Sequence, residues 1–285
     1  MEYGIRIKRN DGEIFVFDSD SDFILTEVTG IDFVPNEVFK EPRGFGNGDL
    51  ITGKRKHGRE IGIKALSRIY KGEKYRSNRD YAIAFFYSNY SFNLEITYIG
   101  KTMIAKDCII QENSFPSERN GKNAFLEIVF LSPYSDLFAH SGETTDFTST
   151  KALWHDTRIY EGAAGKLAFG EMVRTTEKII NYLGSEPAPP IITVKASGYV
   201  PGITIELGQE KTTINTKLYQ GDVLKIDCEK KLVYKNKKLV PLSEYNVWEL
   251  AAVAISYGDN IVKVYNDKSS AFSSEIAYVG RYGGL

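Results

Sequence analysis

The feature that most constrains this fold is an alternation of apolar and polar residues, with a period of two, along most of the chain. Such alternation is typical of β-strands that bury one face. Turn-forming pairs such as Asn120-Gly121 and Gly221-Asp222 separate the alternating stretches. We therefore predict a mainly β protein. The stretches with the clearest alternation are 61–66, 94–99, 124–131, 203–207, 223–228 and 261–265.

One segment departs from the strand pattern. Ser77 and Asp80 resemble a helix-capping box, because a hydroxyl stands three residues before a carboxylate. The apolar residues that follow fall on one face of a helix: Ala82, Phe85 and Phe86. We predict one α-helix over about 77–89, packed on a sheet through these side chains. No repeated strand–helix order follows, which argues against a doubly wound α/β fold.

Composition and charge exclude several classes of protein. The 285 residues carry 36 basic and 37 acidic side chains, a formal net charge of −1, which argues against a chain that mainly binds nucleic acid. The sequence opens without the apolar segment of a signal peptide, and no apolar run approaches the ~18 residues of a membrane span. Cys108 and Cys228 stand in strand-like stretches, where we expect buried free thiols.

The chain is long enough for two domains. Strand-like sequence ends near Pro133, and the proline-rich stretch 187–190 precedes a fresh series of strands. We predict an N-terminal domain over 1–135, with the helix, and a C-terminal antiparallel β-sandwich over 136–285. Residues 136–185 have weak periodicity and could be a linker, an insertion or part of the first domain.

The patterns of known metal and catalytic sites are incomplete in this sequence. The run Asp18, Asp20, Asp22 opens like a calcium loop, but the positions for the turn glycine and the bidentate carboxylate do not match. The glycine-rich stretch 44–48 follows no clear strand and indicates a flexible loop. The three histidines form no zinc motif. We therefore predict no enzyme activity, no metal and no cofactor.

A short basic cluster follows the glycine-rich stretch. On charge alone it indicates either a solvated hairpin tip or an anion site. We keep it as a candidate subunit-interface loop, made of Arg55, Lys56, His57 and Arg59.

Taken in order, these features resemble the distal tail proteins of long-tailed, non-contractile bacteriophages, the siphovirus tail component family. The resemblance is strongest from Gly53 to Tyr134, with a glycine, a basic loop and an "R-x-I-x-I"-like strand at 59–63. A helix and a strand–glycine–strand hairpin follow, and the closing strand ends in Pro133-Tyr134. The stretches 221–227 and 258–264 resemble the family's C-terminal, galectin-like β-sandwich.

The resemblance implies a structural role in a phage or prophage virion. It implies a homo-oligomer, expected as a hexameric ring, at the tail tip or baseplate, assembled in the host cytoplasm. Such a ring joins the tail-tube protein to the tail-associated hub protein and carries receptor-binding or baseplate proteins for host attachment.

A galectin-like sandwich leaves a second hypothesis open, a carbohydrate-binding module of a cell-surface or cell-wall-active protein. Its candidate sugar contacts are Trp248 and Glu249. None of the three histidines lies in the C-terminal sandwich strands, so the His-x-Asn-x-Arg element of sugar-binding galectins is absent. The sequence therefore favours a docking platform over a lectin.

Overall fold

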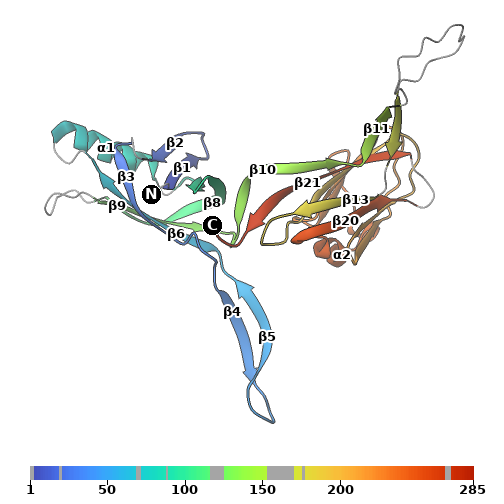
Figure 1. The fold of residues 1–285 in the computed structure, drawn as a ribbon, viewed down its shortest axis with the longest axis horizontal. Helices are drawn as coiled ribbons and strands as arrows, with labels where there is room; N and C mark the ends of the chain where they lie inside the picture. Colours follow the sequence, from blue (N-terminus) through green and yellow to red (C-terminus); the bar gives the residue numbers. More distant parts are fainter. Residues whose placement is uncertain are drawn as a thin grey trace, which may run out of the picture. The chain divides into compact units, whose positions relative to one another are not determined.

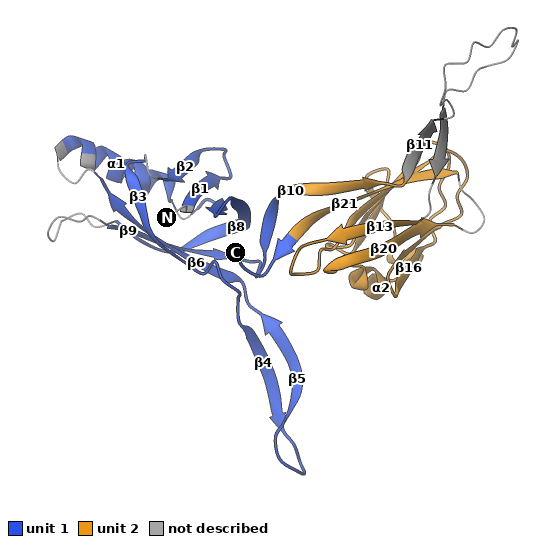
Figure 2. Ribbon diagram, in the orientation of Figure 1, with its two compact units in different colours: residues 1–140, 281–285 blue, residues 141–280 orange. Residues whose placement is uncertain are grey.

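A computed structural model describes residues 3–18, 21–68, 72–87, 89–115, 125–152, 170–174, 177–266 and 271–285. The chain divides into two compact units, residues 1–140 with 281–285 and residues 141–280 (Figure 2). The chain leaves unit 1 within strand β10 (Leu137–Asp146) and returns within β21 (Phe272–Tyr282). The fold is mainly β and antiparallel, which confirms the predicted fold class.

Unit 1 is built from antiparallel strands and one helix (Figure 1). Strands β2, β1, β7 and β8 pair in that order, and β8 continues into a second set of pairs through β9, β6 and β3. Its elements are β1 (Tyr3–Arg9), β2 (Ile14–Phe17), β3 (Phe23–Thr29), β4 (Asn36–Pro42), β5 (Asp49–Lys56), β6 (Arg59–Ser67), α1 (Gly72–Phe85), β7 (Phe92–Tyr98), β8 (Lys101–Ser114) and β9 (Phe125–Ser132).

The long strand β8 joins the two sets of pairs in unit 1. Its first half pairs with β7 as far as Cys108, and its second half pairs with β9 from Ile109 onward. The change of partner falls beside Asp107, which has a positive φ of 53° and whose backbone N–H donates to the Asn93 Oδ1. A local distortion of this kind redirects a strand from one sheet to another.

The core of unit 1 is rich in phenylalanine. The helix contributes the face predicted from the sequence, because Ala82, Phe85 and Phe86 are all buried. The rings of Phe85 and Phe86 contact Phe15 of β2 with centroids 5.2 and 4.9 Å apart. Aromatic pairs at these distances stabilise the packing of the helix on the sheet in addition to the burial of apolar area.

The predicted bounds of the helix, 77–89, are wrong at both ends. The helix begins at Gly72 and ends at Phe85, so the supposed capping box at Ser77 and Asp80 lies inside it. Glu73, Lys74, Arg76 and Ser77 in the first turns are exposed and polar, so this part of the helix shows little apolar periodicity in the sequence. The acidic side chain of Glu73 in the first turn suits the positive end of the helix dipole.

Among its described residues, unit 2 contains two larger antiparallel sheets and a separate two-stranded sheet, β11–β12. One larger sheet has the order β13–β20–β15–β16, and the other contains β19, β18, β17, β14 and β21. Its elements are β11 (Thr148–Ala152), β12 (Gly170–Arg174), β13 (Glu177–Tyr182), β14 (Ile191–Ala196), β15 (Ile203–Leu207), β16 (Glu210–Ile214), β17 (Val223–Asp227), β18 (Leu232–Lys235), β19 (Lys238–Leu239), the 3-10 turn Leu242–Glu244, α2 (Val247–Ala252) and β20 (Gly258–Tyr265).

An aliphatic core fills the space between the two larger sheets of unit 2. Ile205 and Val262 come from one sheet, and Ile192, Leu224 and Ile276 come from the other; all five are essentially inaccessible to water. This arrangement is a β-sandwich in which alternate residues of each strand face inward. Its likeness to galectins in particular stays a prediction.

Candidate assembly surface

Strands β4 and β5 form a ribbon that extends away from the sheets of unit 1 (Figure 1). The two strands pair only with each other, from Asn36 opposite Lys56 to Pro42 opposite Asp49. The glycine-rich stretch 44–48, predicted as a flexible loop, forms the turn at its tip. An isolated two-stranded ribbon is marginally stable in water, so this element gains from a partner.

The ribbon exposes apolar side chains as well as backbone edges. Every residue of β4 is exposed, and Ile51 of β5 is 69% exposed. Exposed apolar groups that cluster on one element are typical of a surface that another protein covers. The large apolar side chains of this ribbon surface are Val38, Phe39, Phe45, Leu50 and Ile51. No sequence pattern singles them out, although Phe45 lies inside the glycine-rich stretch and Leu50 and Ile51 follow it closely.

Three members of the predicted basic loop lie at the root of the ribbon. Arg55 and Lys56 end β5, and His57 follows directly. The His57 Nε2 lies 2.8 Å from the Glu37 Oε2 on β4, so this contact links the two strands where the ribbon begins. Arg55 is exposed. The structure therefore keeps Arg55, Lys56 and His57 together on the surface, at the root of the hairpin rather than at its tip.

Arg59 is separated from the other three residues of the predicted loop. It opens β6 and is only 1% exposed. Its guanidinium donates to backbone carbonyls from four separate places in unit 1: Gly30, Asp32, Ser135 and Gly283. Arg59 therefore anchors the root of the ribbon from inside, and the interface proposal below rests on the other three residues.

The electrostatics of Arg59 fit this structural role. Burial lowers the pKa of the Arg59 guanidinium, while the carboxylates of Asp136 and Asp32 act in the opposite direction. The planar guanidinium presents five N–H donors in a fixed geometry, and here these donors bind carbonyls of several chain segments at once. The backbone also approaches closely here, because a Cβ on Gly30, whose φ is +78°, would lie 1.8 Å from the Glu60 carbonyl oxygen.

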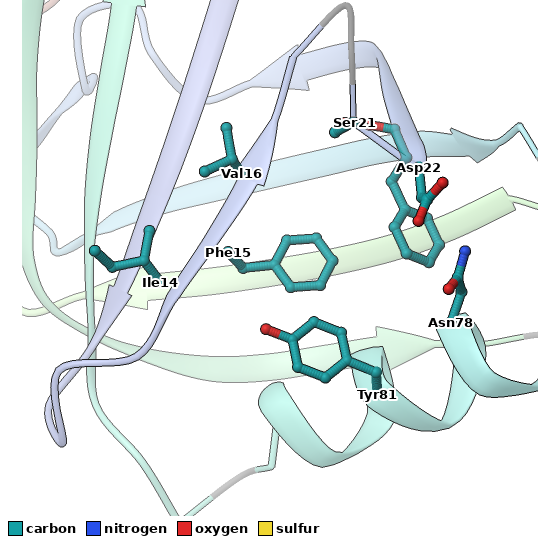
Figure 3. Close-up of a pocket in the computed structure, with 8 residues that line it drawn as sticks. Ile14, Phe15, Val16, Ser21, Asp22, Asn78 and Tyr81 are labelled. Carbon is teal, nitrogen blue, oxygen red and sulfur yellow. Dashed lines mark hydrogen bonds between the residues drawn. The ribbon is translucent and has the colours of Figure 1, made fainter.

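A pocket of about 160 Å³ opens where β2, the start of β3 and α1 meet (Figure 3). Its apolar lining comes from Ile14, Phe15, Val16 and Phe23, with the ring of Tyr81 stacked on that of Phe15 at 5.7 Å. Its polar lining comes from Ser21, Asp22 and Asn78. Asp22, which belongs to the acidic run that does not match a calcium loop, is thus part of a formed concave site.

The predicted sugar contacts Trp248 and Glu249 lie on the short helix α2 of unit 2. The Asn246 side chain caps this helix, since its Oδ1 accepts from the Trp248 backbone N–H and its Nδ2 donates to the Glu249 carboxylate. The Trp248 indole is 83% exposed. Glu249 is therefore engaged with its own helix cap, and Trp248 is the free member of the pair.

Two further kinds of group could carry chemistry, the thiols and the metal-ligating side chains. Both thiols, Cys108 and Cys228, are buried and unpaired as expected, and burial raises the pKa of each to about 12. Among the described residues no group of three His, Cys, Asp or Glu could hold a metal ion. The sequence neighbours Trp154, His155 and Asp156 lie outside the described residues. In the described part of the chain, no helix has the length and apolar character needed to cross a membrane.

Comparison with known proteins connects this geometry to phage tails. Residues 183–282 match the family model described as the siphovirus-type tail component, C-terminal domain. No curated protein sequence matches the chain. The crystal structure of the phage SPP1 Dit protein, described as a paradigm of the hub adsorption apparatus in phages that infect Gram-positive bacteria, aligns over 97% of this chain and 98% of that one. The TM-score is 0.64 and the sequence identity 11%.

Two structures of the phage P2 baseplate in its activated conformation also align along the chain. Their TM-scores are 0.43 and 0.42, at 12% and 13% identity, over 97% of this chain and 98% of theirs. Their TM-scores are below that of the SPP1 protein, and the comparison of folds uses the SPP1 protein.

The fold and the matched domain point to one class: residues 183–282 carry the C-terminal domain of siphovirus-type tail components, and the chain has the fold of the phage SPP1 Dit protein. Within that class, the predicted resemblance to the distal tail proteins is confirmed, because unit 2 carries the family's C-terminal domain and the chain as a whole has the SPP1 Dit fold.

Proposed function

We propose that this protein forms a closed ring of identical subunits at the tip of a phage tail, with six copies expected. The observation that carries this proposal is the ribbon β4–β5, which is exposed along all of β4 and most of β5 and pairs with no other described strand. In a ring, such a ribbon reaches a neighbouring copy and buries its apolar side chains there.

The charge of the chain is compatible with this assembly. A net charge of −1 per subunit produces little self-repulsion when copies pack side by side. A ring also needs two different complementary patches on each subunit, because head-to-tail contacts close by rotation. The ribbon provides one patch. The basic cluster Arg55, Lys56 and His57 at its root is the proposed electrostatic part of that patch.

The decisive experiment measures the mass of the purified chain by light scattering, with negative-stain images of the same fraction. We expect a ring near six times 32.1 kDa. A shortened variant, in which Asn-Gly replaces residues 38–54, should be monomeric yet keep the thermal unfolding midpoint of the rest of unit 1. The matched control is Trp248→Ala, which changes an exposed aromatic side chain outside the ribbon. If the shortened variant still forms rings, the ribbon does not hold the ring together.

In the virion, we place this ring between the tail-tube protein and the tail-associated hub protein. Receptor-binding or baseplate proteins would dock at its edge, and the ring would assemble in the host cytoplasm before joining the tail. These placements rest on the likeness to the SPP1 protein and on the matched tail-component domain. The role requires surfaces and stability rather than catalysis, so we propose that the chain is not an enzyme.

The carbohydrate-binding alternative rests on one observation, the 83% exposed indole of Trp248. Exposed aromatic rings can stack on sugar rings, but Glu249 beside it is bonded to Asn246 and is not free to bind a hydroxyl. A glycan array tests this alternative directly. Binding that disappears in Trp248→Ala would support a lectin role, and an array without binders would leave the docking role alone.

A further inference from the structure

The pocket at α1 has the size and lining of a site for one aromatic side chain. Its volume is about 160 Å³, and cavities of roughly 150 Å³ lined by apolar groups can hold a benzene ring. The rings of Phe15 and Phe23 lie 5.6 Å apart, and Tyr81 stacks on Phe15. Tyr81 is about half exposed, so the pocket is accessible from outside unit 1.

The polar side of the pocket carries an unused donor. The Asn78 Nδ2 is buried and has no hydrogen-bond partner among the described residues. A buried donor without a partner costs free energy, so a rotation of the Asn78 amide toward an incoming carbonyl oxygen would be favourable. Asp22 lies next to it in the pocket (Figure 3), and among the described residues its carboxylate has one long contact, 4.0 Å, with Lys74. The pocket thus combines an apolar floor, a free donor and an available carboxylate.

The tip of the β4–β5 ribbon has the complementary groups. Phe45 is fully exposed, and it stands between Gly44 and Gly46, whose φ is +93°. Gly44 and Gly46 have no side chains and nothing lies within 4 Å of where a Cβ would stand, so their carbonyls can approach a donor such as the Asn78 amide. Arg43 stands two residues before Phe45 and can pair with the Asp22 carboxylate.

We propose that the pocket of one copy receives the Phe45 side chain of a neighbouring copy. The tip belongs to a different part of unit 1 from the pocket, and no residue of the ribbon lines the pocket in the same chain. Eight residues of β5 span about 25 Å at roughly 3.3 Å per residue, a reach suited to a neighbour. Because the two patches differ, the contact is head-to-tail and repeats around a ring. This inference rests on the proposed ring.

The test is disulfide trapping between two singly substituted chains. Phe45→Cys copies are mixed with Tyr81→Cys copies under mild oxidation, and the products are separated on a non-reducing gel. The native thiols are buried, and burial raises the pKa of both to about 12, so they stay out of the reaction. The matched control mixes Phe45→Cys with Tyr199→Cys, a tyrosine of nearly the same exposure on unit 2. Thermal unfolding of each variant verifies its fold.

We expect a cross-linked dimer from the Phe45→Cys and Tyr81→Cys mixture, at least tenfold above the control. Light scattering on the same samples before oxidation separates the two hypotheses. Rings without a cross-link above the control would overturn the assignment of the pocket and leave the ring intact. A monomer at every concentration, again without the cross-link, would overturn the ring itself and the pocket assignment with it.

Discussion

The two hairpins β4–β5 and β15–β16 are built from similar strands but have opposite surroundings. β15–β16 belongs to a four-stranded sheet and buries Ile203, Ile205 and Ile214 in the core of unit 2. β4–β5 pairs with no third strand in the described part of the chain, and its apolar side chains face water. An apolar strand can therefore stabilise its own chain or form a contact with another chain, and what lies opposite the strand decides between the two.

The ribbon depends on its root, so the largest effect is expected at Arg59. In Arg59→Leu, the four carbonyl groups that the guanidinium serves lose their donor in a buried place. We expect unit 1 to lose about 3–5 kcal/mol of its free energy of unfolding. Urea unfolding of the full chain measures this, with the exposed Arg55→Leu as control. Equal stability of the two variants would mean that the buried guanidinium contributes nothing.

The hairpin of unit 2 should respond strongly to loss of an inner side chain. Ile214→Ala leaves a cavity in a core where the isoleucine is 0% exposed. Such truncations cost about 2–5 kcal/mol, and we expect a loss in this range for unit 2. Chemical denaturation followed by tryptophan fluorescence is the measurement. A loss below about 1 kcal/mol would show that β16 packs more loosely than its burial indicates.

The same truncation in the ribbon should separate stability from assembly. Ile51→Ala removes a side chain that is mostly exposed, so the stability of the isolated subunit should change by no more than about 0.5 kcal/mol. The fraction of subunits in rings should nevertheless fall, because the neighbour loses apolar contact. Light scattering over a dilution series measures the assembly. A large loss of subunit stability with unchanged assembly would reverse the contrast between the two hairpins.

The smallest expected effect concerns acid and a turn of unit 2. The Asp222 carboxylate accepts from the Tyr219 backbone N–H and from Asn236, and it pairs with Lys235. These contacts lower its pKa from 3.8 to about 2. Because the folded-state pKa is lower, the contribution to stability is present above pH 4 and disappears as the pH falls toward 2. Thermal unfolding from pH 5 to pH 2 should show this, and Asp222→Asn should reduce the slope. An identical slope in that variant would assign the acid sensitivity to other carboxylates.

Several features were predictable from sequence because they depend on local periodicity. The predicted strands at 61–66 and 203–207 fall within β6 and β15, and the one at 94–99 falls within β7 except for its last residue. Side chains of a strand alternate between its two faces, so the pattern indicates which residues point inward before any partner is known. The inner face of α1 was predictable for the same reason, while its polar first turns left no such pattern.

Only the tertiary structure decided what lies opposite each apolar face. The ribbon residues Phe39, Leu50 and Ile51 would suit a core, but no other described strand of unit 1 pairs with them. In the sequence, Arg59 is indistinguishable from its basic neighbours. The carbonyls that bind its guanidinium in the fold come from positions far apart in the chain, so no local pattern shows that it is buried. The pocket likewise forms where three elements meet. Strand identity was thus fixed by local alternation, whereas burial, anchoring and the pocket depend on long-range contacts that no short stretch of sequence contains.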